Sequence, residues 1–281
     1  MHIGIGFFLS LIIGDRGWIP NPVRLLDKPH LQKNRPPGAL HVAAIIGIAY
    51  LAVWMIILIT AQVSLVLSIA VSSYFVYTEL SIHSPGKKAK LVYEALHEGN
   101  RVLAGKRLSD ILRHDTQDMN EEEIVSATVE TMAKNTVNGM IAPLFYIFIG
   151  GPALGMAYKV LNTLANRNDF GSTAARFDDL ANWIPARLTG LIMPMAGSMC
   201  GKEGRRGYKI FNRDKKKSKN LNNGYPVAAM AGVLGIQIAN LGDPLKNAES
   251  QDILEAARVM RMTAFLGLAA FYIVALKFGN I

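Results

Sequence analysis

The apolar residues of this chain are gathered into separate runs, and the longest covers residues 40–77 without a charged side chain. A single helix of that length would exceed the roughly 30 Å hydrocarbon core of a bilayer. We therefore predict two membrane-crossing helices, 40–59 and 61–77, with a hairpin break at residues 60–62. Lys and Arg residues flank the pair on both sides, which predicts that both of its outer ends are cytoplasmic.

The other apolar runs predict further crossings at 2–13, 139–158, 188–200, 226–239 and 263–278. The first run is short, and it lacks the basic segment and the cleavage site of a signal peptide. Pro143 and the sequence Gly150-Gly151-Pro152 interrupt the run 139–158, so we expect a kinked helix or two half-helices facing protein or a wet cavity. The small residues of 226–239 suit close helix packing in a membrane.

The polar segments between these runs also show helical patterns. Residues 83–113 carry an amphipathic spacing, and Asn120 followed by three glutamates predicts a helix N-cap. The predicted fold is therefore all-α: a polytopic integral membrane helical bundle with cytoplasmic-side amphipathic helices and loops, built as a single membrane-embedded domain, 1–281. Lys and Arg concentrate in 14–39, 78–138 and 201–225, which we predict to be cytoplasmic.

Composition refines this view. The formal net charge is +9, which can indicate nucleic acid, anionic lipid or an anionic substrate. No helix-turn-helix, zinc-finger or RNP-type pattern accompanies the charge, so no nucleic-acid partner is expected. Cys200 is the single cysteine, which excludes an intrachain disulfide and a metal site made of several cysteines.

Four polar clusters stand out against the apolar background. The first contains Asp15 and Arg24, around two prolines, and could equally be a helix stop followed by a loop. The second contains Asp115, Glu130 and Asn135, and could equally be a capped turn with a solvated helix face.

The third cluster extends from Tyr158 to Arg187 and contains the adjacent carboxylates Asp178 and Asp179. Such a pair can hold Mg²⁺ when a phosphate supplies further ligands. Lys159, Arg176 and Arg187 could clamp phosphate oxygens. The alternative is a network of ion pairs beside the membrane.

The fourth cluster contains Asp214, Asn220 and the turn Gly224-Tyr225, ahead of an apolar helix. A helix N-terminus after a glycine turn can bind an anion, although ordinary N-capping explains the same pattern. Neither a Walker A loop nor a dinucleotide glycine pattern occurs. The residues alone predict a membrane protein with a basic, carboxylate-containing site on the cytoplasmic side, suited to a phosphorylated substrate with Mg²⁺.

At these clusters the sequence resembles the membrane-bound adenosylcobinamide-phosphate synthase family of cobalamin biosynthesis. The matching motifs follow the family's order over nearly the whole chain: Gly14-Asp15, Pro22-Val23-Arg24, Asp115-Thr116, Glu130-Thr131, Asn135-Thr136-Val137, Ala142-Pro143-Leu144, Tyr158-Lys159, Asn162-Thr163-Leu164, the run from Ala175 to Thr189, and Ala228-Ala229-Met230. The run that ends in Pro185-Ala186-Arg187-Leu188-Thr189 is specific to the family.

The resemblance implies ATP-dependent amide bond formation, in which a ligase joins aminopropanol phosphate to the corrinoid adenosylcobyric acid, giving adenosylcobinamide phosphate. It implies ATP and Mg²⁺ as cofactors, the cell (inner) membrane as location, and other pathway enzymes of the membrane as partners. Mapped onto this chain, the catalytic candidates are Asp15, Asp115, Glu130, Asp178 and Asp179, with Asp178 and Asp179 as the metal ligands. The candidates for binding substrate or phosphate are Arg24, Asn135, Lys159, Asn162, Arg176, Asn182, Arg187, Asp214 and Asn220.

The chain departs from the family pattern inside these clusters. Lys134, Asn138 and Val227 stand where acids are expected, and Ala239-Asn240 replaces a Gly-Gly pair. Asn21 and His114 replace a His and an Arg, and the segment after Leu164 is shortened. An alternative is therefore a catalytically impaired family member that binds a corrinoid or scaffolds the pathway. A transporter or sensor built on the same frame is a third possibility.

Overall fold

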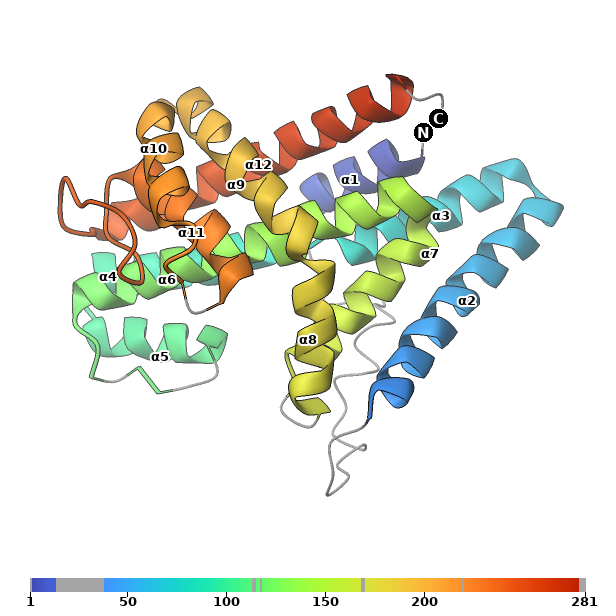
Figure 1. Cartoon of the computed structure of the whole chain (residues 1–281), viewed down its shortest axis with the longest axis horizontal. Helices are drawn as coiled ribbons and strands as arrows, with labels where there is room; N and C mark the ends of the chain where they lie inside the picture. Colours follow the sequence, from blue (N-terminus) through green and yellow to red (C-terminus); the bar gives the residue numbers. More distant parts are fainter. Residues whose placement is uncertain are drawn as a thin grey trace. The chain divides into compact units, whose positions relative to one another are not determined.

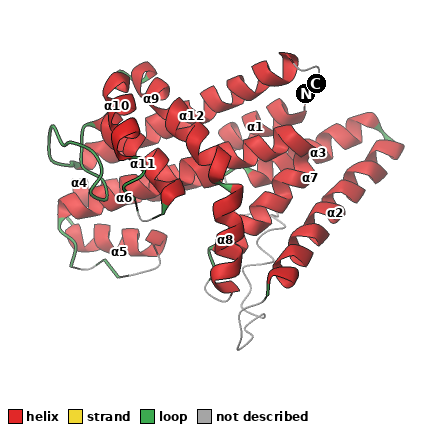
Figure 2. Ribbon diagram, in the orientation of Figure 1, coloured by secondary structure: helices red, strands yellow, loops and turns green. Residues whose placement is uncertain are grey.

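The computed structural model describes residues 2–13, 38–112, 115–116, 118–167, 170–218 and 220–277. Within these ranges the regular secondary structure is helical, and no strand is formed (Figure 2). The predicted all-α class is confirmed. Asp15, Arg24, Asn21 and His114 lie outside the described residues.

The chain divides into two compact units, each of which is discontinuous in sequence. The first comprises residues 1–81, 138–183 and 271–281, and the second comprises 82–137 and 184–270. The prediction of one membrane-embedded domain stays a prediction. The helices of the first unit are α1 (His2–Ile13), α2 (Ala39–Val63), α3 (Leu65–Glu79), α7 (Ala142–Ala165) and α8 (Gly171–Ala181). The second unit contains α4 (Ser84–His97), α5 (Arg101–Leu112), α6 (Glu121–Thr136), α10 (Gly204–Asp214), α11 (Leu221–Leu234), and most of α9 (Trp183–Met199) and α12 (Ser250–Lys277).

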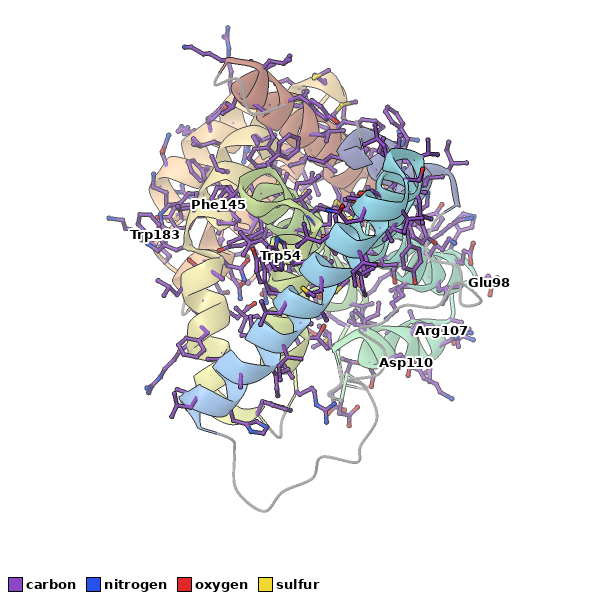
Figure 3. All side chains as sticks on the ribbon, turned by 90° about the vertical axis from the view of Figure 1, so that its right-hand side faces the viewer. Trp54, Glu98, Arg107, Asp110, Phe145 and Trp183 are labelled. Carbon is purple, nitrogen blue, oxygen red and sulfur yellow. The ribbon has the colours of Figure 1, made fainter. Side chains whose placement is uncertain are left out.

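In the first unit, α2 and α3 form the predicted hairpin, and α2 runs beside α7 (Figure 1). The helices are separated at Ser64, whose extended backbone (φ −164°, ψ 136°) ends α2 and begins α3. Only Val42 and Val53 of α2 are buried, and Trp54 is among its exposed large apolar side chains (Figure 3). An apolar helix with so much exposed surface is suited to contact with lipid.

Helix α7 is bent, as the sequence predicts. Gly150 and Gly151 leave helical geometry, and Gly151 has φ of 70°, a conformation that glycine adopts without the steric cost of a side chain. Pro152 follows directly and removes one backbone donor. The C-terminal part of α7 then carries Tyr158, Lys159 and Asn162, so the bend directs the segment on which three candidate site residues lie.

In the second unit, α4 and α5 form a hairpin, with exposed Glu98, Arg107 and Asp110 on its surface (Figure 3). The predicted N-cap of α6 is confirmed, because the Asn120 side chain accepts from Glu123 N and the Glu123 carboxylate accepts from Asn120 N. Helix α11 packs tightly on α10: a Cβ at Gly232 would lie 2.9 Å from the Gly207 Cα. The small residues therefore have the packing role that the sequence predicts.

Four helical stretches of the described chain are long and apolar enough to cross a membrane: Ala39–Val63, Leu65–His97, Glu121–Ala165 and Ser250–Lys277. Helix α1 contributes a shorter apolar segment, Ile3–Ile12. The protein is a helical membrane bundle of several passes. The crossings predicted at 188–200 and 226–239 fall on α9 and α11, which have 17 and 14 residues. These helices are shorter than the roughly 20 residues that a perpendicular crossing needs, so both crossings stay predictions.

Candidate functional site

Two tyrosines of α7, one on each side of its bend, hydrogen bond to the end of α8. The Tyr158 hydroxyl donates to Asn182 Oδ1 at 2.9 Å, and the Tyr146 hydroxyl donates to the backbone carbonyl of Ala181 at 2.8 Å. The two rings are stacked, with centroids 5.0 Å apart. Because Asn182 Oδ1 accepts from Tyr158, its amide nitrogen is left to donate elsewhere. This arrangement fixes the last turn of α8, which carries Asp178.

Asp178 is held by neutral amides. Asn162 Nδ2 donates to Asp178 Oδ1 at 3.0 Å, and Asn182 also hydrogen bonds to this carboxylate. Burial raises the pKa of Asp178 to about 6; the hydrogen bond from Asn162 lowers it, the charge of Asp179 raises it, and the bond from Asn182 lowers it. The carboxylate is therefore largely ionised at neutral pH. The neutral amide donors stabilise its negative charge but do not cancel it.

Lys159 lies one helical turn before Asn162 on α7, so the two side chains share a face. Its ammonium donates to Ser81 Oγ at 2.8 Å, and its charge acts on Glu79. Glu79 is fully buried at the end of α3, and neither of its carboxylate oxygens has a hydrogen-bond partner in the described part of the chain. A Cβ on Gly155 would lie 2.1 Å from Glu79 Oε2, so α7 can approach this carboxylate only with glycine there.

The adjacent acids Asp178 and Asp179 do not converge on one point. Neighbouring residues of a helix face different directions, and Asp179 is exposed while Asp178 is half-buried. In the described ranges, no three His, Cys, Asp or Glu side chains gather as a metal site. Mg²⁺ needs only one or two carboxylates when phosphate and water complete its shell. Asp178 thus fits a magnesium ion that arrives with a phosphorylated substrate, and exposed Arg176 lies on the same helix.

In the second unit, the predicted catalytic residue Glu130 lies on α6 and is paired with a lysine. Lys134 Nζ is 2.6 Å from Glu130 Oε1, one helical turn along. Glu130 also lines an open cavity of about 450 Å³, together with Asn120, Glu122, Glu123, Ser126, Ala127, Gln237, Ala239 and Asn240. The resemblance expects an acid at position 134, which would place a second carboxylate beside Glu130. In this chain Lys134 instead neutralises the Glu130 carboxylate.

The rim of this cavity contains an unusual turn. Ile238 and Leu241 exchange backbone hydrogen bonds around Ala239 and Asn240, whose φ angles are 49° and 63°. Two consecutive left-handed residues define a type I′ turn, which favours glycine or asparagine. The Gly-Gly pair that the resemblance expects at these positions suits this backbone without strain, whereas Ala239 does not.

The other predicted site residues of the second unit have structural contacts. Arg187 lies over the ring of Tyr225, 4.5 Å from its centroid, and the Asn220 side chain caps α11 by accepting from Asn222 N and Asn223 N. Asp214 is buried between Arg213 and Lys217, each at 2.6 Å, and hydrogen bonds from Arg213 hold the pKa of Asp214 well below its usual range. Asn135 is half-buried on α6, and Asp115 is exposed beside buried Thr116. Their binding and catalytic roles stay predictions.

Three residues of the α7–α8 cluster were missing from the predicted site: Glu79, Ser81 and Tyr146. Glu79 was detectable, because a lone carboxylate two residues beyond a long charge-free run marks a functional candidate in a membrane protein. Tyr146 and Ser81 carry no such signal, since their partners are distant in sequence. The structure brings together Asn162, Asp178 and Asn182, which all belong to the third predicted cluster.

Comparison with known proteins agrees with the resemblance of the sequence to a family of cobalamin biosynthesis. The family model described as "CobD/Cbib protein" matches residues 3–262. The cobalamin biosynthesis protein CobD of Geobacter metallireducens is 36% identical over 90% of this chain and 89% of its own length. CobD of Leptospira interrogans is 32% identical over 96% of both chains, and the cobalamin biosynthesis protein CbiB of Salmonella typhi is 30% identical over 95% of this chain and 94% of its own.

No solved structure matches the chain. The family match includes the motif from Ala175 to Thr189, and this motif supplies Asp178 and Asn182 to the cluster between α7 and α8. The chain belongs to the CobD/CbiB family of cobalamin biosynthesis proteins.

Proposed function

We propose that this protein is an ATP-dependent ligase of the cell (inner) membrane, which joins aminopropanol phosphate to adenosylcobyric acid and forms adenosylcobinamide phosphate. The observation that carries the proposal is the Asn162–Asp178–Asn182 cluster, in which the family's most specific motif supplies Asp178 and Asn182. Its carboxylate is ionised at neutral pH and held by amides rather than by a cation. It is therefore able to bind a cation that accompanies phosphate.

The chemistry needs an activated carboxylate. In the proposed sequence, the corrinoid carboxylate attacks the γ-phosphorus of ATP, giving an acyl phosphate and ADP. The amine then attacks the acyl carbon and loses a proton to solvent, and inorganic phosphate leaves with one oxygen of the original carboxylate. Mg²⁺, when bound, would neutralise phosphate charge, with Asp178 as its protein ligand and phosphate and water oxygens completing its shell.

The other residues of the first unit would position the phosphate groups. Lys159 carries a charge next to buried Glu79, and its bond to Ser81 sets the direction of the ammonium. Arg176, exposed on α8, would add a second cation. Tyr158 and Tyr146 act through Asn182 and the end of α8, so they are positioning residues. Their hydrogen bonds keep the carboxylate of Asp178 in place before substrate arrives.

The experiment is a direct synthesis assay with purified protein in detergent. Adenosylcobyric acid, aminopropanol phosphate, ATP and Mg²⁺ are supplied, and the amide product and ADP are quantified. With ¹⁸O in the corrinoid carboxylate, one label per turnover is expected in inorganic phosphate. Corrinoid binding without product would favour the alternative of an impaired family member that binds a corrinoid or scaffolds the pathway.

A further inference from the structure

One side of α12, in the second unit, changes from charged to apolar along its length. Glu255, Arg258 and Arg261 follow one another at intervals of three, which places them along one side of the helix. Both arginines are exposed, and no carboxylate among the described residues forms an ion pair with either of them. Phe265, one turn after Arg261, is 40% exposed. The stripe therefore passes from cations to an apolar ring.

A third cation joins this stripe from the turn between α9 and α10. Lys202 Nζ lies 2.5 Å from Glu255 Oε2, which ties the turn to α12. The charges of Lys202, Arg258 and Arg261 all act on the sulfur of Cys200, so the three cations belong to one region of the second unit. Together with Glu255 they leave an excess of two positive charges, which favours an anion.

Exposed apolar side chains of α9 precede Lys202 in the chain. Leu191, Met195 and Met199 recur every four residues along one face, and Met195 and Met199 are 53% and 62% exposed. Met199 is separated from Lys202 by only two residues. The patch thus combines exposed apolar groups with cations, as at the boundary between the hydrocarbon and the headgroups of a bilayer. A soluble anion would be bound by the cations alone and would not need the exposed apolar side chains.

We propose that Lys202, Arg258 and Arg261 bind the phosphate group of an anionic phospholipid, whose acyl chains lie along Met195, Met199 and Phe265. This lipid site is independent of the proposed ligase reaction. It selects lipids by charge, because a zwitterionic headgroup brings its own cation to the phosphate. Each cation near an anionic lipid surface contributes on the order of 1 kcal/mol.

The test is lipid binding to the delipidated full-length protein, with phosphatidylglycerol and phosphatidylcholine as probes and native mass spectrometry as readout. The variant Arg258→Gln/Arg261→Gln should bind phosphatidylglycerol about thirtyfold more weakly. Its binding of phosphatidylcholine should be unchanged. The matched control Arg205→Gln/Lys209→Gln removes two exposed cations from α10 and should change either affinity less than about threefold.

Two results would overturn the proposal. Equal losses of phosphatidylglycerol affinity in the two double variants would mean that general surface charge attracts the lipid. Displacement of the lipid by glycerol 3-phosphate at a similar concentration would identify a site for soluble anions. The variant Met195→Ser/Met199→Ser separates these chemistries, because it should weaken binding of the lipid and leave binding of glycerol 3-phosphate unchanged.

Discussion

Two carboxylates that were predicted as catalytic have opposite surroundings in this protein. Asp178, in the first unit, is held by the neutral amides of Asn162 and Asn182 and has its pKa raised to about 6 by burial. Glu130, in the second unit, is paired with Lys134 at 2.6 Å. A carboxylate held by amides keeps its negative charge available for a cation, whereas the charge of a carboxylate in an ion pair is already neutralised by its partner. The contrast indicates that Asp178 carries the cation-binding capacity that the proposed reaction needs.

The largest expected effect comes from breaking the amide support of Asp178. Asn182→Leu removes the acceptor of the Tyr158 hydroxyl and one donor to the carboxylate, so turnover should fall by about a hundredfold, the usual cost of losing a preorganised polar group. Asn182→Asp keeps the acceptor but adds a like charge, and it should be as damaging. The assay is initial velocity of amide formation, with Asn247→Leu, an exposed loop position of the second unit, as control. Equal velocities for Asn182→Leu and the control would contradict the role.

The second prediction concerns the stability cost of Asp178. Since its folded pKa of about 6 exceeds the ordinary value of 3.8, the folded state binds more protons between pH 4 and pH 6. Stability attributable to this group therefore falls as pH rises through that window. Asp178→Asn should be more stable than the wild type by about 2 kcal/mol at pH 8, and nearly equal to it below pH 4. Thermal unfolding in detergent at each pH measures the difference. A difference that is constant with pH would show that the carboxylate is not destabilised by burial.

The third prediction frees Glu130 from its lysine. Lys134→Glu with Asn138→Asp restores the acids that the family resemblance expects, and it should raise turnover several-fold, on the order of 1 kcal/mol, and steepen its Mg²⁺ dependence. Lys90→Glu is the matched control, because Lys90 forms the same type of pair with Glu94, 3.3 Å away on α4. Superimposable Mg²⁺ titrations of the restored and original proteins would place positions 134 and 138 outside the site.

The smallest effect is expected at the rim of the Glu130 cavity. Ala239 has φ of 49°, where alanine is strained and glycine is not. Ala239→Gly should therefore stabilise the protein by about 0.5 to 1 kcal/mol, despite the larger entropy of glycine in the unfolded chain. Ala228→Gly, inside α11, should instead destabilise it by about 1 kcal/mol. Denaturant unfolding in detergent provides the comparison, and a loss of stability in Ala239→Gly would show that this turn is unstrained.

The helices were predictable because their apolar runs, breaks and caps are local signals. The hairpin break illustrates the limit: it lies at Ser64, beyond the predicted positions 60–62. The Thr60 hydroxyl donates to the carbonyls of Ile56 and Ile57, so this polar residue is satisfied within the helix and does not end it. The bend of α7 was readable from Gly150-Gly151-Pro152, because the positive φ of Gly151 favours glycine and the proline removes a backbone donor.

The candidate site was only partly predictable, because its contacts join distant parts of the chain. Asn162 and Asp178 are 16 residues apart, and Lys159 and Ser81 are 78 apart, so sequence spacing could not pair them. The Glu130–Lys134 pair was different: its spacing of four on a helix is itself a sequence signal. Glu79 also has a local signal, because it is a lone carboxylate two residues beyond the charge-free run, and the structure buries it completely.

The most direct test of the account is amide synthesis by Asp178→Asn. This variant preserves the size of the side chain and one oxygen that can accept from Asn162, while it removes the charge and replaces the other oxygen with an amide donor. With both substrates, ATP and Mg²⁺, the wild type should form product, and Asp178→Asn should lose at least a hundredfold of that rate while remaining folded. The control Asp110→Asn, an exposed position on α5, should keep the wild-type rate. Wild-type turnover by Asp178→Asn would contradict the central claim.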